Sequence, residues 1–158
     1  MIQVRKATRE DILGIQQVAH VTWHYTYEHI MRPDTRALVL AEFYSEESLA
    51  CSLERKEIAF LVAEEAGRII GFAQALPRPQ SGYEVTRTYI LPQYQRKGVG
   101  TQLTAELAKS LPGQTLWVFV ERENQGALAF YRTQGFKQQR ELELPIYSET
   151  LPFIELSR

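Results

Sequence analysis

The feature that most constrains this chain is a basic, glycine-containing loop between an apolar run and a helical pattern. Residues 89–101 read YILPQYQRKGVGT, so an extended apolar segment ends at a proline and a helix opens near the second glycine. Gly98 and Gly100 have no Cβ atom, which lets a ligand approach the backbone closely. The first turn of a helix has N–H groups without intrahelical partners and a partial positive charge, and both attract anions. The segment therefore predicts a pyrophosphate site on the amides of residues 96–101.

Other phosphate-binding loops fit this segment less well. A Walker A loop places its lysine directly after the last glycine, whereas Lys97 precedes Gly98 here. A dinucleotide-binding fingerprint continues with a third glycine, but position 103 is a leucine. An ordinary strand-to-helix turn is the remaining alternative on local grounds, so the rest of the chain has to decide between a turn and an anion site.

Composition limits the class of protein. A chain of 158 residues with 44% hydrophobic residues is expected to form one globular domain over residues 1–158. The formal net charge of -1 provides no basic field, so we expect no nucleic-acid partner. There is no apolar signal core and no apolar run of the roughly 18 residues that a membrane helix needs. We therefore expect a cytoplasmic protein without a membrane partner. Cys51 is the only cysteine, which excludes an internal disulfide.

Hydrophobic periodicity predicts helices and strands along the whole chain. A capping signal at residues 8–11 opens a first helix, and residues 38–53 form a second helical region that Ser45 is able to interrupt. Two further helices start at the glycine loop and at Asn124. Apolar runs predict strands at residues 2–7, 58–63, 69–75, 84–91, 115–120, 136–144 and 153–156. This order predicts a mixed α/β sheet with helices on both faces.

Two motifs in this order resemble the GNAT superfamily of N-acetyltransferases, and the resemblance covers nearly the whole chain. The loop Gln95-Arg96-Lys97-Gly98-Val99-Gly100 matches the family signature Gln/Arg-x-x-Gly-x-Gly/Ala in full. The family's later stretch of an asparagine, Ala-x-x-Phe-Tyr and Gly-Phe is similar to Asn124, Ala127, Phe130-Tyr131 and Gly135-Phe136. The resemblance implies an α+β fold with a mixed, largely antiparallel, splayed sheet of six to seven strands and about four helices. It also implies acetyl-CoA as the cosubstrate and a primary amine as the acetyl acceptor.

The resemblance also assigns roles to particular residues. It implies that acetyl-CoA contacts the strand end, the glycine loop and the second motif, through Ile90, Leu91, Gln95, Arg96, Lys97, Gly98, Val99, Gly100, Thr101, Asn124 and Tyr131. A backbone N–H near Leu91 would stabilise the negative oxygen that develops when the amine attacks. Tyr131 matches the general acid that protonates the departing thiolate, whereas periodicity alone favours packing of Tyr131 beside Phe130. Asn124 is an ordinary helix cap on local grounds, and this role is compatible with a contact to acetyl-CoA.

The acceptor amine needs a base, because an alkylammonium with a pKa of about 10.4 is only about one part in a thousand neutral at pH 7. Glu84 is the candidate general base. It lies on the strand that carries Ile90, and the even spacing between the two residues places their side chains on one face of a regular strand. An exposed glutamate at a strand start is the competing interpretation.

Trp23 and Tyr27 are the candidate acceptor-binding residues. They lie one helical turn apart where members of the family build the acceptor pocket, although core packing explains their spacing equally well. Residues 28–57 contain four basic and seven acidic side chains, and this balance of 4 minus 7, or -3, favours a cationic acceptor. The Trp-x-x-x-Tyr pattern followed by a proline, together with Glu84-x-x-Arg87-x-Tyr89, is similar to bacterial polyamine acetyltransferases of the spermidine/spermine type.

We therefore expect direct transfer of the acetyl group to a small cationic amine, such as a polyamine, in a ternary complex. A protein N-terminal or lysine acetyltransferase is one alternative, and a non-catalytic CoA-binding regulatory module is another, from a different class. No metal is expected, because His20 and His24 share a helical spacing without an accompanying carboxylate–histidine pattern. Exposed edge strands in this fold allow a homodimer, by analogy with the family.

Overall fold

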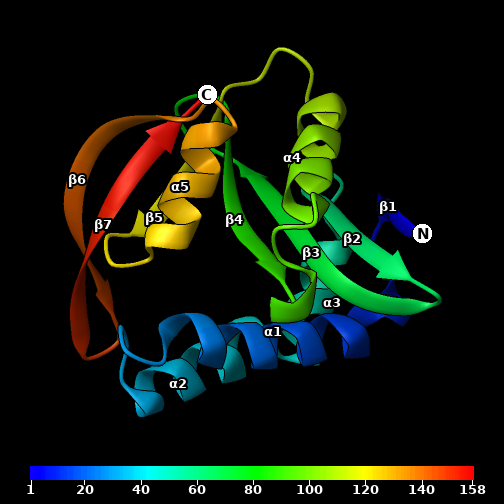
Figure 1. Cartoon of the computed structure of the whole chain (residues 1–158), viewed down its shortest axis with the longest axis horizontal. Helices are drawn as coiled ribbons and strands as arrows, with labels where there is room; N and C mark the ends of the chain where they lie inside the picture. Colours follow the sequence, from blue (N-terminus) through cyan, green and yellow to red (C-terminus); the bar gives the residue numbers. More distant parts are fainter.

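The computed structural model describes all 158 residues, and its centre is a seven-stranded sheet (Figure 1). The strands are β1 (Ile2–Lys6), β2 (Ala59–Glu65), β3 (Arg68–Pro77), β4 (Tyr83–Ile90), β5 (Leu116–Glu121), β6 (Lys137–Ile146) and β7 (Glu149–Ser157). The helices are α1 (Ile12–Tyr27), α2 (Pro33–Phe43), α3 (Glu46–Glu54), α4 (Val99–Ser110) and α5 (Gln125–Thr133), with short 3₁₀ helices η1 (Arg9–Asp11) and η2 (Pro92–Tyr94). The order in the sheet is β1-β2-β3-β4-β5-β7-β6, and only β4 and β5 are parallel. The predicted mixed, largely antiparallel sheet is confirmed.

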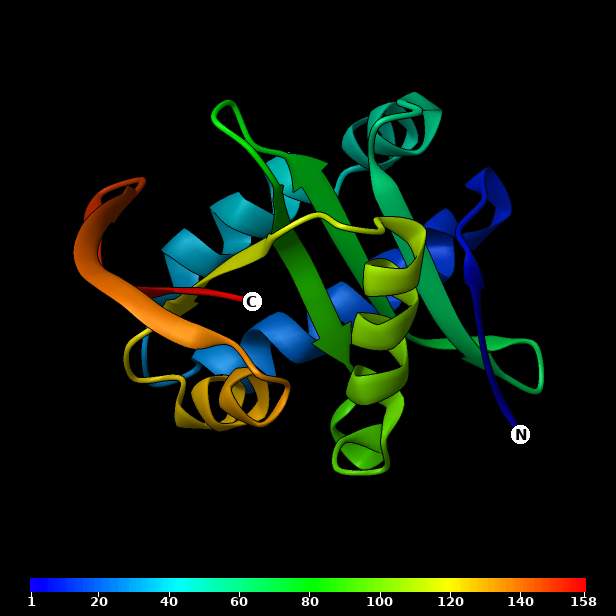
Figure 2. The ribbon, with the colours of Figure 1, turned by 90° about the horizontal axis from the view of Figure 1, so that it is seen from above.

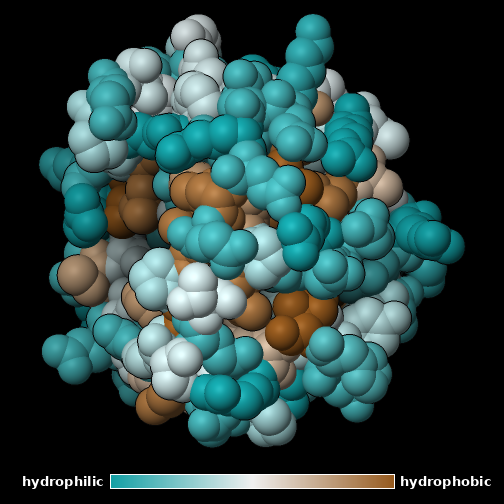
Figure 3. Space-filling model, turned by 90° about the vertical axis from the view of Figure 1, so that its left-hand side faces the viewer, coloured by the Kyte–Doolittle hydropathy of each residue, from teal (hydrophilic) through white to brown (hydrophobic).

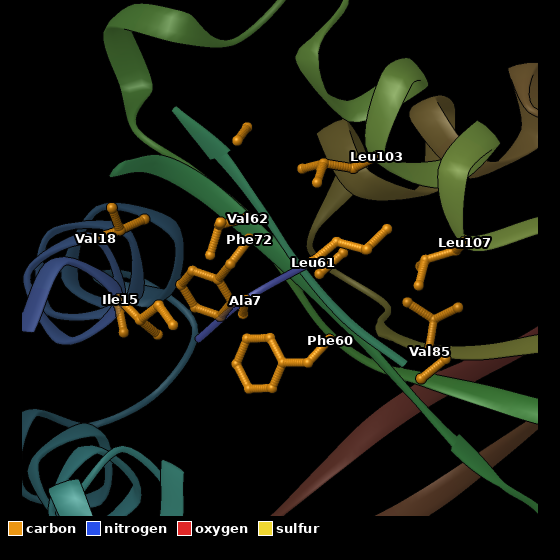
Figure 4. Packing of buried hydrophobic residues seen from close by; sticks show 14 of the residues in the cluster. Ala7, Ile15, Val18, Phe60, Leu61, Val62, Phe72, Val85, Leu103 and Leu107 are labelled. Atoms are coloured by element: carbon orange, nitrogen blue, oxygen red, sulfur yellow. The ribbon is translucent and has the colours of Figure 1, made fainter. Parts of the chain in front are cut away.

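Helices cover both faces of this sheet, as the two ribbon views show (Figures 1 and 2). Ile15 of α1 is fully buried and lies on the same side of β3 as the ring of Phe72 (Figure 4). Leu103 and Leu107 of α4 are equally buried and lie on the opposite side of the sheet, where Leu107 is beside Val85 of β4 (Figure 4). The core therefore has two layers, one under α1 and one under α4. None of the helices combines the length and hydrophobicity that a bilayer crossing requires.

The predicted second helical region is two helices. Ser45 has extended backbone angles, and its side-chain oxygen accepts a hydrogen bond from the N–H of Ser48 at 3.1 Å, so it caps the start of α3. Tyr44 has already left the helical region at the end of α2. The structure consequently has five α-helices rather than about four, and the interruption falls at the serine that the sequence indicated.

The last two strands are longer than their apolar runs predicted, because a proline is tolerated inside β7. The carbonyl oxygen of Pro152 accepts the N–H of Arg122 at 2.9 Å. The N–H that proline lacks would point to the same side, toward the residue that follows the end of β5. Pairing of β7 with β5 starts one residue later, at Phe153. The missing N–H ends the ladder between β5 and β7 at this point, whereas the pairing with β6 does not use it, so β7 continues through Pro152.

An ion pair between Arg5 and the buried Asp11 joins β1 to η1, and it makes the stability of the protein depend on pH. Both carboxylate oxygens of Asp11 accept hydrogen bonds from Arg5, at 2.8 and 2.9 Å, and Asp11 is 6% exposed. These bonds lower the pKa of Asp11, so its stabilisation is complete above the unfolded-state pKa and is lost as the pH falls through the folded-state value. We expect Asp11→Asn to lower the free energy of unfolding by about 2 kcal/mol at pH 7. The difference should shrink between pH 5 and pH 3 in urea titrations.

Glu64→Gln is the matched control for this prediction. Glu64 binds the same guanidinium at 2.7 Å but its side chain is 21% exposed, against 8% for Asp11. Because solvent screens the more exposed pair, the control should cost less than about 1 kcal/mol. Equal losses for both variants would show that the buried position of Asp11 has no special role.

Candidate active site

A cavity opens where the parallel pair of strands separates. β4 and β5 pair only from Tyr83 with Leu116 to Val85 with Val118, and β4 then continues to Ile90 without a partner on that side. A cavity of about 1060 Å³ lies beside this free edge. Its walls come from the end of β4, the glycine loop, the start of α4, α5 and the C-terminal end of α1. The separation of the strands therefore creates an open site with unpaired backbone groups along one wall.

The glycine loop turns sharply to enter α4. Gly98 has a φ of 83°, and Arg96 also has a left-handed φ of 62°. The N–H of Gln102 donates to the carbonyl of Gly98 at 3.0 Å and closes the first turn. The N–H groups of residues 99–101 precede that first intrahelical bond, so they are available to an anion. The side-chain amide of Gln95 donates to the carbonyl of Ile90 at 3.0 Å and ties the loop to the free edge of β4.

Gly100 is required by close packing rather than by its backbone angles. A Cβ atom at this position would lie 3.0 Å from the ring of Phe130 and 3.2 Å from the Cδ1 atom of Ile90. The absent side chain lets α4 approach both α5 and β4. This contact holds the glycine loop against the wall that carries the second motif.

The cofactor residues predicted from the sequence do not all reach the cavity. Of these predicted residues, the ones that line the cavity are Ile90, Gln95, Arg96, Gly98, Gly100, Thr101, Asn124 and Tyr131. Val99 is 1% exposed and belongs to the core, so only its backbone remains available to a ligand. The ammonium group of Lys97 lies 5.6 Å from the centre of the Tyr94 ring, outside the cavity wall.

The backbone N–H of Leu91, one of the predicted cofactor contacts, does not itself face the cavity. The N–H of Leu91 donates to the carbonyl of Ile70 on β3 at 2.9 Å, and its side chain is 3% exposed. Successive N–H groups of a strand point to opposite edges, so the N–H of Ile90 faces the cavity instead, followed by that of Thr88. The donors on this wall are therefore the amides of Thr88 and Ile90.

Tyr131 belongs both to the core and to the cavity wall. It is 6% exposed and contacts the rings of Phe130 and Phe136, each with a centroid 5.1 Å away. Burial raises the pKa of Tyr131 to about 12, and a hydrogen bond with Thr88 opposes part of that shift. The phenol is thus protonated throughout the physiological pH range. Core packing and a role as a proton donor are compatible here.

Asn124 caps α5 at the same wall. Its Oδ1 atom accepts the N–H of Ala127 at 3.3 Å, which satisfies one of the free donors of the first turn. Its side-chain amide also lowers the pKa of Tyr27 through hydrogen bonding. The predicted cap is confirmed, and the residue still faces the cavity.

Glu84 does not share a face with Ile90, because β4 has a bulge. Gln74 pairs with Arg87 and Ala75 pairs with Val85, so Thr86 is an extra residue that reverses the alternation of side chains. Val85 consequently points toward α4 (Figure 4). Ile90 also points toward α4, and Glu84, which is adjacent to Val85 in the strand, points to the opposite face. Glu84 lies outside the cavity wall, in the field of Arg78 and Glu155. The geometric reason for choosing it as the base is wrong.

Trp23 and Tyr27 are part of an aromatic cluster beside the cavity. Their ring centroids are 4.5 Å apart, and the indole N–H of Trp23 donates to the hydroxyl of Tyr44 at 3.3 Å. The hydroxyl of Tyr27 lies 3.2 Å from that of Tyr89, which does line the cavity. Neither Trp23 nor Tyr27 lines the cavity directly. The cluster supports the wall from behind.

Sequence reasoning missed several residues of the site. Thr22, Thr26 and Thr88 line the cavity, but isolated threonines on a helix or strand have no distinguishing signal. Glu121 is 2% exposed at the end of β5, close to the wall. A charged residue that ends the apolar run from Leu116 was the available signal for it.

The class of protein that this fold and cavity define is an acetyl-CoA-dependent acyltransferase. The structure combines a splayed sheet, free amides at the start of α4 and a buried, protonated tyrosine. The chain belongs to the acetyltransferase (GNAT) family, which matches residues 18–136. The family and the fold expected from the sequence are both confirmed.

Individual relatives carry more specific names. Spermidine N(1)-acetyltransferase of Thermoplasma acidophilum is 30% identical over 143 residues, which cover 86% of this chain and 88% of that protein. The crystal structure of PaiA N-acetyltransferase from T. acidophilum in complex with coenzyme A is similar with a TM-score of 0.85 and 27% identity, and the match covers 98% of both chains. N-alpha-acetyltransferase RimI of Mycobacterium tuberculosis is 34% identical over 82 residues, which cover 50% of this chain and 52% of that protein.

Proposed function

We propose that this chain transfers the acetyl group of acetyl-CoA to a primary amine of a polyamine, by direct attack in a ternary complex. The observation that carries the proposal is the single cavity that joins the free amides of the glycine loop to the phenol of Tyr131. One end of this cavity suits a diphosphate, and the other end has a proton donor for a thiolate. The similarity to a spermidine acetyltransferase and to a structure with bound coenzyme A supports the same assignment.

The chain's own groups suggest how acetyl-CoA is held. The amides of residues 99–101 and the guanidinium of Arg96 would bind the diphosphate. The free edge of β4, at Thr88 and Ile90, would hydrogen-bond the pantetheine arm as a substitute strand. The bound thioester supplies an activated acetyl group. Either of these two strand amides is placed to donate to the carbonyl oxygen during attack.

Tyr131 is the proposed proton donor for the leaving thiolate. Its phenol is protonated at neutral pH, because burial raises its pKa to about 12. The same apolar surroundings raise the pKa of a thiol, so a thiolate formed here is a stronger base than in water. The greater basicity of the thiolate offsets the weaker acidity of the buried phenol.

The face of the sheet under α1 and α2 has the chemistry of a cationic acceptor site. Phe119 pairs with Glu155 and Glu121 pairs with Phe153, so aromatic rings and carboxylates alternate on one face of β5 and β7. Phe119 and Phe153 are half-buried. Glu155 is paired with Arg78 and Arg140, so Glu121 is the carboxylate of this row without an ion-pair partner. On the β6–β7 side of the molecule, hydrophobic residues are surrounded by hydrophilic ones (Figure 3). Aromatic rings suit the methylene chain of a polyamine, and the negative charge of Glu121 behind them favours a cation.

The test is an acetyl-transfer screen with detection of released thiol. Spermidine and spermine should give the highest kcat/KM, and a peptide with a free N-terminal alanine should be at least about tenfold poorer, since it lacks a second ammonium group. A peptide that exceeds the polyamines would favour the N-terminal acetyltransferase, the alternative to which the RimI match also points. Saturable CoA binding without amine-dependent thiol release would favour the regulatory module.

A further inference from the structure

Glu121 is a buried carboxylate without a positively charged partner. It is 2% exposed, and no lysine, arginine or histidine lies within ion-pair distance. Its Oε2 atom accepts the N–H of Glu123 at 2.6 Å. A carboxylate in this position needs a chemical reason, because burial without a cation disfavours its charged form.

A pair of phenols links this part of the fold to the cavity. Tyr89 lines the cavity, and its hydroxyl lies 3.2 Å from the hydroxyl of Tyr27 on α1. Tyr27 in turn lies in the field of Glu121. Asn124 adjoins both residues: its N–H donates to the backbone carbonyl of Glu121 at 2.9 Å, and its side-chain amide lowers the pKa of Tyr27. Tyr89, Tyr27 and Glu121 thus follow one another from the cavity into the protein.

The reaction requires such a route. The acceptor arrives as an ammonium ion and must lose one proton before its nitrogen lone pair can attack the acetyl carbon. The nitrogen loses a second proton after the C–N bond forms, and the thiolate gains one when the C–S bond breaks. With Tyr131 serving the thiolate, one proton remains, and it must leave the site.

We propose that Tyr89, Tyr27 and Glu121 form a relay that removes the first proton of the acceptor ammonium. This inference rests on the proposed function. The ammonium donates to the oxygen of Tyr89, the hydroxyl of Tyr89 donates to Tyr27, and Tyr27 passes its proton to Glu121, directly or through one water molecule. The amine is then neutral, each phenol is restored, and Glu121 is protonated. It releases its proton to solvent before the next turnover.

The charges around Glu121 suit this role. Tyr27 of α1 lies in the field of Glu121, Phe153 opposes Glu121 on β7, and Arg122 and Glu123 of its own loop have opposite charges. Burial raises the pKa of Glu121, which brings the carboxylate closer to the neutral pH at which a base is most effective. Glu121 and Tyr27 act through Tyr89, the member that faces the cavity.

The experiment compares Glu121→Gln, Tyr27→Phe and Tyr89→Phe with wild type on spermidine between pH 7 and pH 9.5. Each variant should lower kcat/KM for spermidine about 100-fold at pH 7, with the KM for acetyl-CoA unchanged. The loss should shrink about tenfold for each pH unit, because the variants must use the neutral amine already present in solution. A purely structural defect would give the same loss at every pH.

Tyr44→Phe is the matched control, since Tyr44 is another buried phenol in the same aromatic cluster. It should keep wild-type kinetics, and thermal unfolding of all variants checks that they are folded. Wild-type turnover with an unaffected Glu121→Gln variant, or with a pH-independent loss, overturns the relay alone. Absence of amine-dependent turnover in the wild-type protein overturns the proposed function and the relay together.

Discussion

Replacement of Tyr131 with phenylalanine is expected to lower kcat for acetyl transfer about 100-fold, equivalent to about 2.7 kcal/mol in the activation barrier. The variant keeps the ring that contacts Phe130 and Phe136, so the core and the cavity wall should persist. It loses only the hydroxyl that donates a proton to the leaving thiolate. Steady-state kinetics with saturating spermidine provides the measurement, and the KM for acetyl-CoA should change less than about threefold.

The nature of the leaving group offers an internal control for this prediction. An acetyl thioester of an acidic aromatic thiol leaves as a stable thiolate and does not need a proton from Tyr131. The variant should approach the wild-type rate with such a donor, whereas a folding defect would reduce both reactions equally. A kcat within about fivefold of wild type on acetyl-CoA would remove Tyr131 from the mechanism.

Introduction of a negative charge at Gly98 is expected to weaken CoA binding about 30-fold relative to a neutral residue of the same shape. The matched pair is Gly98→Asp and Gly98→Asn, because both side chains tolerate the left-handed φ of 83° and nothing lies within 4 Å of a Cβ atom there. Repulsion from a diphosphate on the neighbouring amides contributes about 2 kcal/mol. Titration calorimetry at two salt concentrations gives the affinities, and the difference should shrink at high salt.

Gly113 provides the control for the backbone effect. It has a φ of 75° in an exposed turn, and a Cβ atom there also meets nothing within 4 Å. Gly113→Asp and Gly113→Asn should lower stability as much as the Gly98 variants do, without any change in CoA affinity. Equal CoA affinities of the two Gly98 variants would show that the diphosphate binds elsewhere.

The sequence predicted the parts of the site that depend on local geometry. The glycines at 98 and 100 identify a tight entry into a helix, and the structure has a left-handed residue at the first and a close helix contact at the second. The cap at Asn124 is equally local, because it depends on residues three apart. Ser45 belongs to the same group, since its hydroxyl decides where α3 begins.

Features that depend on strand pairing were not accessible from the sequence. The even spacing of Glu84 and Ile90 predicts a shared face only for a regular strand, and the extra residue at Thr86 appears only once β3 is paired with β4. The donor expected near Leu91 is the amide of Ile90 rather than that of Leu91, because the carbonyl of Ile70 on the neighbouring strand accepts the N–H of Leu91. Both details depend on how β4 pairs with β3.

The carboxylate at Glu121 shows a third kind of limit. Its position at the end of an apolar run is visible in the sequence, but the contact of Tyr27 with Tyr89 joins residues 62 positions apart. No periodicity within α1 or β4 indicates that pairing. The connection from the cavity to Glu121 therefore emerges only from the folded arrangement of α1, β4 and β5.

A crystal structure of this protein with coenzyme A tests the central claim most directly. The diphosphate should lie within hydrogen-bonding distance of the amides of residues 99–101, and the pantetheine arm should run along Thr88 and Ile90 toward Tyr131. Coenzyme A bound away from the gap between β4 and β5, or a pantetheine arm that does not reach Tyr131, would contradict the account.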